Sequence, residues 1–155
     1  MNPDTLERIL FVSSSGGVLL DLLALEPWWS KYRVAWAVVE APDTASALAG
    51  QTCYWIGNTS FRRPFRIVLD FVSAWRILRR ERPQLIVSAG SGPAIAFFAL
   101  ARVLGIPTFW IYTLNILATP GVSAKICTRM SSRVFLQQTS LLAAHPDGIV
   151  IGELY

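Results

Sequence analysis

The stretch that decides the fold is Arg8-Ile-Leu-Phe-Val-Ser-Ser14, which runs directly into Ser15-Gly16-Gly17. A short apolar run that ends in small residues before a helical pattern is typical of a buried strand in an α/β protein. Here the helical pattern follows over residues 17–26. Such a turn presents backbone N–H groups at the amino end of a helix, where an anion is stabilised. The opening stretch therefore predicts a strand, an anion-binding turn and a helix.

A second copy of this arrangement lies in mid-chain, at Leu85-Ile-Val-Ser-Ala-Gly-Ser-Gly-Pro93. Pro93 suits the first position of a helix, whose dipole favours a phosphate at its amino end. Glycine can also serve turn geometry alone, so that alternative stays open for each turn. Two such turns in one chain favour a diphosphate or sugar-nucleotide ligand. The residues expected to hold the diphosphate are Ser14, Ser15, Gly16, Gly17, Gly90, Ser91 and Gly92.

Apolar runs alternate with helical patterns along the whole chain. Strands are predicted at Arg8–Ser14, Arg33–Val39, Thr52–Ile56, Gln84–Ala89, Thr108–Tyr112, Arg133–Gln137 and Gly148–Ile151. Helices are predicted at Gly17–Glu26, Thr44–Ala49, Phe65–Arg80, Pro93–Leu104 and Val122–Met130, with a short one near Thr139–Ala143. Unbroken hydrophobic strands that alternate with helices indicate a parallel, doubly wound, Rossmann-like α/β sheet. Ligands of such sheets bind outside the carboxyl ends of the strands, where both glycine turns fall.

Length and composition predict one domain with apolar surface to spare. The 155 residues fit a single domain, 1–155. Hydrophobic residues make up 53% and charged residues 15% of the chain, whereas charged residues typically make up about 25%. This surplus predicts contact with a membrane or another protein. Cys53 and Cys127 match no metal-ligand spacing and no disulfide framework, so neither a metal site nor a disulfide is predicted.

Half of the positive charge lies in residues 62–82, which contain seven arginines and two acidic residues. The apolar residues between them form one helical face that can pack on the sheet and a second that needs an apolar neighbour. Arginines around Trp and Phe suit an anionic bilayer surface. The residues predicted to bind the membrane are Arg62, Arg63, Arg66, Phe71, Trp75, Arg76, Arg79 and Arg80. The alternative is a buried helix with solvated ends; nucleic acid is disfavoured because no base-reading motif is present.

Conventional catalytic sets are missing from the sequence. The single histidine, His145, lies in His-Pro-Asp-Gly, a turn composition. Asp21 follows the first glycine turn, and Asn115 follows the fifth predicted strand. These two are the catalytic candidates, and Thr113 and Asn115 are placed to hydrogen-bond a sugar.

Four segments together resemble one known family: Ile9-Leu-Phe-Val-Ser-Ser-Ser-Gly-Gly-Val-Leu19, Ile86-Val-Ser-Ala-Gly-Ser-Gly-Pro-Ala-Ile-Ala-Phe-Phe98, Gly105-Ile-Pro-Thr-Phe-Trp-Ile-Tyr112 and Gly148-Ile-Val-Ile-Gly-Glu-Leu-Tyr155. The family is the membrane-associated subunit of the two-part N-acetylglucosaminyltransferase that extends dolichol-diphosphate-linked sugar, with its bacterial exopolysaccharide relatives. The resemblance covers nearly the whole chain. It implies the amino-terminal half of a GT-B glycosyltransferase, similar also to that half of the peptidoglycan N-acetylglucosaminyltransferase of glycosyltransferase family 28.

The resemblance implies a function for each part of the chain. This half would bind a polyprenyl-diphosphate-linked sugar acceptor and an anionic membrane surface. A separate polypeptide would supply the carboxyl half and hold most of the UDP-sugar donor, with no further cofactor. The complex would act in surface polysaccharide or glycolipid biosynthesis, peripherally, on the cytoplasmic face of the plasma membrane.

Two departures from the family leave the catalytic role open. Val18 stands where the family usually has His, and Tyr112-Thr-Leu-Asn115 stands where it commonly has an acidic residue. Either the partner carries the chemistry, or a residue such as Asp21 has taken it over, or the chain is a non-catalytic anchor. A free-standing nucleotide-binding protein is a further alternative.

Overall fold

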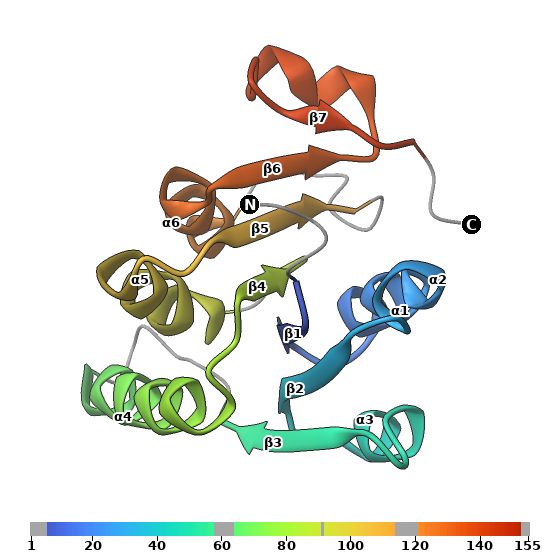
Figure 1. Cartoon of the computed structure of the whole chain (residues 1–155). Helices are drawn as coiled ribbons and strands as arrows, with labels where there is room; N and C mark the ends of the chain where they lie inside the picture. Colours follow the sequence, from blue (N-terminus) through green and yellow to red (C-terminus); the bar gives the residue numbers. More distant parts are fainter. Residues whose placement is uncertain (1–5, 58–63, 91, 114–120, 153–155) are drawn as a thin grey trace.

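In the computed structural model, the described residues are 6–57, 64–90, 92–113 and 121–152. Their strands form one seven-stranded sheet in the order β3-β2-β1-β4-β5-β6-β7 (Figure 1). Every neighbouring pair is parallel. The strands are β1 (Arg8–Ser13), β2 (Arg33–Val39), β3 (Thr52–Ile56), β4 (Leu85–Ser88), β5 (Thr108–Tyr112), β6 (Arg133–Leu136) and β7 (Ile149–Val150). The predicted Rossmann-like, doubly wound α/β fold is confirmed.

Helices lie on both faces of the sheet (Figure 1). One face carries α1 (Gly17–Leu23), α2 (Glu26–Trp29) and α3 (Pro42–Ala47). The other carries α4 (Pro64–Glu81), α5 (Ala94–Leu104), α6 (Val122–Met130) and the 3-10 helix η2 (Thr139–Ala143). From β1 to β3 the chain proceeds toward one edge of the sheet, and from β4 to β7 it proceeds toward the other edge. Right-handed crossovers therefore place the two sets of helices on opposite faces.

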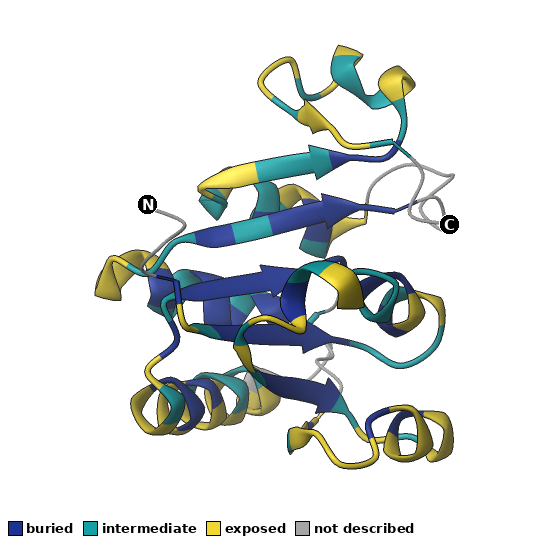
Figure 2. Ribbon diagram, turned by 45° about the vertical axis from the view of Figure 1, so that its right-hand side comes forward, coloured by how far each residue is buried: buried dark blue, intermediate teal, exposed yellow. Residues whose placement is uncertain are grey.

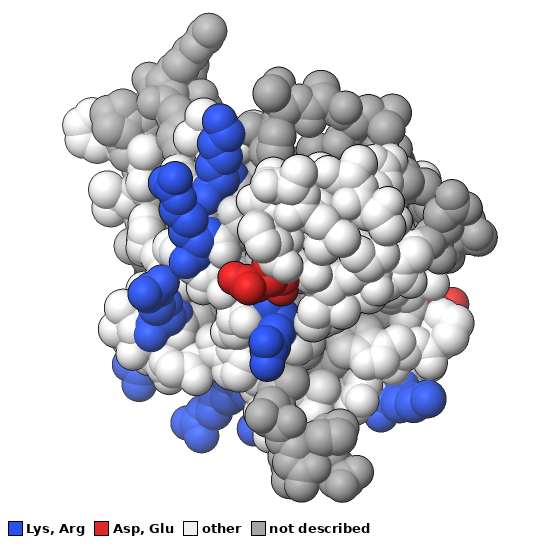
Figure 3. Space-filling model, turned by 90° about the horizontal axis from the view of Figure 1, so that it is seen from above, with Lys and Arg blue, Asp and Glu red and all other residues white. Residues whose placement is uncertain are grey.

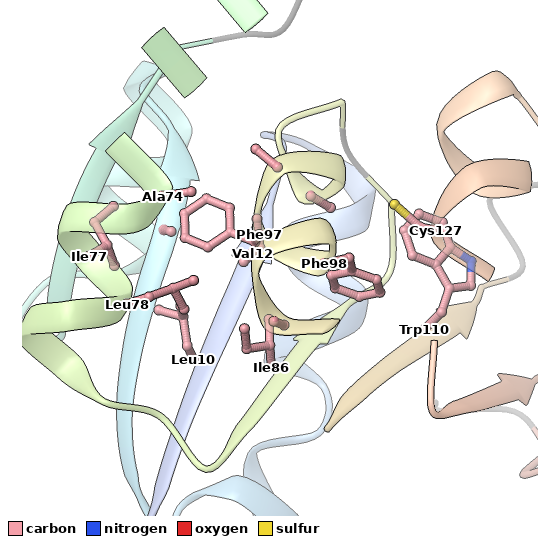
Figure 4. Packing of buried hydrophobic residues seen from close by; sticks show 14 of the residues in the cluster. Leu10, Val12, Ala74, Ile77, Leu78, Ile86, Phe97, Phe98, Trp110 and Cys127 are labelled. Carbon is pink, nitrogen blue, oxygen red and sulfur yellow. The ribbon is translucent and has the colours of Figure 1, made fainter. Parts of the chain in front are cut away.

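The central strands are buried from both sides, as their hydrophobic sequences require (Figure 2). On the α4–α6 face, Phe97 and Phe98 of α5 pack between α4 and Trp110 of β5 (Figure 4). On the opposite face, Phe11 and Trp36 stack with their ring centroids 4.5 Å apart. Two layers of large side chains thus hold β1 and β4 in the middle of the molecule.

Several helices differ from the prediction at their ends, and two of these differences have a local cause. The predicted helix over residues 17–26 ends at Leu23, and α2 starts separately at Glu26, because Pro27 cannot donate the hydrogen bond that would continue α1. The next helix begins at Pro42 rather than Thr44, since the N–H of Ala41 donates to Thr44 Oγ1 at 2.9 Å and fixes the first turn.

The order of the strands predicts where a ligand would bind. β1 and β4 are neighbours, with Ile9 opposite Leu85, and the chain leaves them toward opposite edges of the sheet. In doubly wound sheets, ligands bind outside the carboxyl ends of the strands at this reversal point.

Candidate functional site

The two glycine turns meet at the reversal point. The first follows β1 and the second follows β4. The Ser14 hydroxyl donates to the backbone oxygen of Gly90 at 3.5 Å. A Cβ placed on Gly90 would lie 3.6 Å from Val18 Cγ2. The structure therefore brings together two turns that are more than seventy residues apart in the chain.

The first turn combines an unusual backbone conformation with open space. Gly16 has a φ of +79°, a region that side chains disfavour, yet a Cβ there would meet nothing within 4 Å. Glycine is thus needed at this position for the backbone rather than for room. The Gly16 N–H donates to Oδ2 of Asp43 at 3.2 Å, so a carboxylate already lies at this amide.

The second turn leads into α5, a helix of 11 residues. Gly90 has a φ of +146°, and its N–H donates to Ser88 Oγ at 3.4 Å. Pro93 is the N-cap residue, one position earlier than the first helical position predicted for it. The Ile95 N–H donates to the backbone oxygen of Gly92 at 3.2 Å, which aims the amino end of the helix at the turn. Ser91 lies outside the described residues.

The two catalytic candidates gain no support from the geometry. Asp21 is fully buried in α1, which keeps its carboxylate from any substrate that approaches through solvent. Asn115 lies outside the described residues. Thr113, directly after β5, is 2% exposed, and its hydroxyl has no hydrogen-bond partner among the described residues. A buried hydroxyl of this kind is available to a ligand at the carboxyl edge.

His145 packs on the α6 side of the sheet rather than at the glycine turns. Its ring lies 4.8 Å from that of Tyr112, and it lines a polar hollow of about 340 Å³ together with Thr128 and Asp147. Burial raises the pKa of Tyr112 above its usual value, and the nearby Thr128 hydroxyl opposes this shift. The Gly148 N–H donates to the His145 backbone oxygen at 2.9 Å, so the turn that the sequence predicted here is present.

Helix α4 presents the apolar outer face that the sequence indicated. Phe65 is 85% exposed, Val68 and Leu69 are each 62% exposed, and the Arg79 guanidinium lies 5.7 Å from the centroid of the Trp75 ring. Phe71, however, is half-buried against the core with Ala74, Ile77 and Leu78. Of the predicted membrane residues, Arg66, Trp75, Arg76, Arg79 and Arg80 are exposed, whereas Arg62 and Arg63 lie outside the described residues.

A second group of basic side chains was missed in the sequence. Arg102 of α5, Lys125 and Arg129 of α6 and Arg133 of β6 are all exposed, and Arg102 Nη1 donates to the Arg129 backbone oxygen at 3.4 Å. Figure 3 shows basic side chains gathered along the side of the molecule on which Figure 1 places α5 and α6. These residues are far apart in the sequence and form no local run of charges, so nothing in the sequence marks the group.

The opposite face of β4–β7 bears an apolar hollow with a volume of about 340 Å³. Leu25 and Trp28 form its wall, and its floor comes from four strands or their ends: Val87, Phe109, Ile111, Phe135 and Ile151. Among the described residues, the crossovers between these strands all lie on the other face. Within the described residues this face is therefore only partly covered: Val87 and Ile111 are buried, whereas Phe109 and Phe135 are half-buried.

Within the described ranges, no helix has both the length and the apolar character needed to cross a bilayer. The same residues contain no group of three or more His, Cys, Asp or Glu side chains arranged to hold a metal ion.

The fold is the Rossmann-like α/β fold of a GT-B glycosyltransferase domain. The structure resembles MurG from Acinetobacter baumannii with a TM-score of 0.76 and 18% identity, over 93% of this chain and 45% of that one. It also resembles UDP-N-acetylglucosamine 2-epimerase from Rickettsia bellii, with a TM-score of 0.73 and 14% identity, over 96% of this chain and 45% of that one. Because a transferase and an epimerase share it, the fold alone does not determine the reaction.

Comparison of the sequence with known proteins adds to the comparison of structures. No family model matches the chain. It is 26% identical over 145 residues to UDP-N-acetylglucosamine–N-acetylmuramyl-(pentapeptide) pyrophosphoryl-undecaprenol N-acetylglucosamine transferase from Oceanobacillus iheyensis. The match covers 83% of this chain and 39% of the relative, so the chain spans less than half the length of that enzyme. This similarity agrees with the resemblance to the peptidoglycan enzyme, whereas the resemblance to the two-part enzyme stays a prediction.

Proposed function

We propose that this chain is the acceptor-binding half of a membrane-associated glycosyltransferase. The enzyme transfers a sugar from a UDP-sugar to a polyprenyl-diphosphate-linked acceptor during surface polysaccharide or glycolipid biosynthesis. The observation that carries the proposal is the meeting of the two glycine turns, joined by the Ser14–Gly90 hydrogen bond, at the reversal point of the sheet. The name of the relative from Oceanobacillus iheyensis includes both a UDP-sugar and a pyrophosphoryl-undecaprenol acceptor.

In this proposal, backbone amides of the turns bind the acceptor diphosphate. The N–H groups of Leu19 and Leu20 donate to the Gly16 backbone oxygen at 3.0 and 3.2 Å. The N–H groups of Gly17 and Val18 therefore precede the first hydrogen bond of the helix. Such leading N–H groups need an outside acceptor, and a phosphate supplies one. Ser14 and Ser15 have small side chains and Gly92 has none, which lets a diphosphate approach the backbone closely.

The α4 outer face is the proposed membrane contact. Phe65, Val68, Leu69, Val72 and Trp75 are its exposed apolar residues. Arginines border them, and each basic residue near an anionic surface contributes about 1 kcal/mol. The second basic group, on α5 and α6, lies in the same layer of helices (Figure 1). We place the domain peripherally on the cytoplasmic face of the plasma membrane.

The donor-binding half would come from a separate polypeptide. This chain matches 45% of the length of MurG from Acinetobacter baumannii. The hollow lined by apolar side chains on the β4–β7 half of the sheet offers that partner a docking surface. Two departures favour catalysis by the partner, since Val18 stands where the family usually has a histidine and Tyr112-Thr-Leu-Asn115 stands where it commonly has an acid. They equally favour the alternative that this chain is a non-catalytic anchor.

A reconstituted assay tests the proposal. The full chain is combined with UDP-N-acetylglucosamine, a polyprenyl-diphosphate-linked sugar and anionic vesicles, with and without a short α/β protein encoded beside it. Product is expected only with both proteins. Full activity of this chain alone would exclude the split arrangement, and no product with either arrangement would overturn the proposed reaction. Activity that survives Gly17→Leu and Gly92→Leu but requires the chain itself would select the anchor alternative.

A further inference from the structure

Asp43 is a carboxylate that the sequence motifs did not single out. It is exposed at the start of α3, and its Oδ2 accepts the Gly16 N–H at 3.2 Å. The position of Asp43 is fixed by its neighbour Thr44, which is fully buried. Thr44 Oγ1 accepts the Ala41 N–H at 2.9 Å and lies 2.7 Å from the Ala41 oxygen. The carboxylate is therefore held at the first glycine turn by a rigid helix start.

The same amide is one that an anionic ligand would use. Gly16 faces open space, so the carboxylate is the group that meets this N–H before any ligand arrives. A phosphate placed beside it would bring two negative charges to within about 4 Å. In a water-like environment, repulsion at that distance changes affinity by about five-fold. A carboxylate and a phosphate cannot both accept a well-aligned hydrogen bond from the Gly16 N–H.

We propose that Asp43 is an internal competitor for the anion position at the first turn. Its carboxylate satisfies the Gly16 N–H in the empty site, and a bound diphosphate displaces it. The inference rests on the proposed function, because it takes the ligand to be a diphosphate at these turns. It assigns Asp43 a role in setting affinity for the acceptor, as a positioning and specificity residue rather than a catalytic one.

Two substitutions separate charge from hydrogen bonding. Asp43→Asn removes the negative charge but keeps a side-chain oxygen that can accept the Gly16 N–H. Asp43→Ala removes both. Asp147→Asn is the matched control, because it makes the same change in net charge at an exposed aspartate that lines the polar hollow beside α6.

The test is calorimetric titration of the full chain with farnesyl diphosphate at low and at high salt. Asp43→Asn is expected to bind about three- to ten-fold more tightly than wild type at low salt. The gain should shrink at high salt, because screening weakens exposed charge interactions. Asp147→Asn should bind as wild type does. A role in bracing the turn alone would give Asp43→Asn unchanged or weaker affinity at both salt concentrations, and that result overturns the inference.

A second measurement separates this inference from the proposed function. The amide resonance of Gly16 is followed by NMR in wild type and in Asp43→Ala, before and after farnesyl diphosphate is added. It is expected to differ between the two free proteins and to become similar in the two complexes. If farnesyl diphosphate binds wild type and the Gly16 resonance does not move, the competitor role is wrong. If neither wild type nor any variant binds it, the diphosphate site itself fails, and the competitor role with it.

Discussion

The hydroxyl of Ser14 donates to the backbone oxygen of Gly90 at 3.5 Å and joins the turn after β1 to the turn after β4. These two strands lie side by side in the centre of the sheet. A ligand that spans both turns would therefore contact the amino ends of α1 and α5 together. A diphosphate, with two charged groups, suits such a pair of turns better than a single phosphate does.

Gly16→Ala tests the first turn against a matched control. Gly16 and Gly105 have φ values of +79° and +69°, and a Cβ on either would meet nothing within 4 Å. Alanine at either position should therefore lower the free energy of unfolding by a similar amount, about 1–2 kcal/mol. Gly16→Ala alone should weaken binding of farnesyl diphosphate, because Gly105 ends α5 away from the turns. Equal losses of binding in the two variants would place the ligand elsewhere.

Leu69→Ser tests the apolar outer face of α4. Leu69 is 62% exposed there, and Leu20 of α1, on the opposite face, is 57% exposed. Neither serine should change the free energy of unfolding by more than about 0.5 kcal/mol. Leu69→Ser should reduce partitioning onto anionic vesicles by about ten-fold, because an inserted leucine contributes roughly 1.5–3 kcal/mol. Vesicle sedimentation measures this. A larger loss with Leu20→Ser would assign the membrane contact to the opposite face.

The sequence predicted the sheet and its helices because both depend on local patterns. The runs at Arg8–Ser14 and Gln84–Ala89 are apolar and bounded by glycine turns, and both form central strands. The first helix was predicted too long because its apolar pattern continues up to Pro27. The helix itself ends earlier, since proline cannot propagate it. Phe71 was assigned to the membrane because it lies with Trp75 between the arginines, although only packing against the core decides which side of α4 is buried.

Contacts between distant segments were not predictable in this way. Asp43 meets Gly16 only because β2 lies beside β1, which brings the start of α3 to the first turn. Arg102 and Arg129 come together through the packing of α5 on α6, and no charge run along the chain marks them. The hollow beside Phe109 and Phe135 likewise follows from the handedness of the crossovers rather than from any motif. These features follow from the topology of the sheet.

Burial of Cys127 predicts a pH dependence of stability. Desolvation raises the pKa of its thiol from 9.0 to about 12. In the unfolded chain the thiol ionises near its ordinary pKa, whereas in the folded protein it stays protonated. The stabilising contribution is therefore complete below about pH 9 and is lost as the pH rises toward 12. Urea titrations across this range should show a steeper fall in the free energy of unfolding for wild type than for Cys127→Ala. Parallel curves would mean that the thiol is accessible to water in the folded state.

The apolar hollow on the β4–β7 half of the sheet predicts that the isolated chain binds a fluorescent apolar dye. The hollow of about 340 Å³ lies beside Phe109 and Phe135, whose ring centroids are 5.0 Å apart, and its lining is almost wholly apolar. Anilinonaphthalene sulfonate should therefore fluoresce on binding the folded chain, and Phe135→Ser should reduce the signal. Val103→Ser is the matched control, because Val103 is 83% exposed on α5, which packs on the opposite face. Addition of the carboxyl-half polypeptide should displace the dye, since we propose that it covers this face. Dye that remains bound in an active complex would show that the partner docks elsewhere.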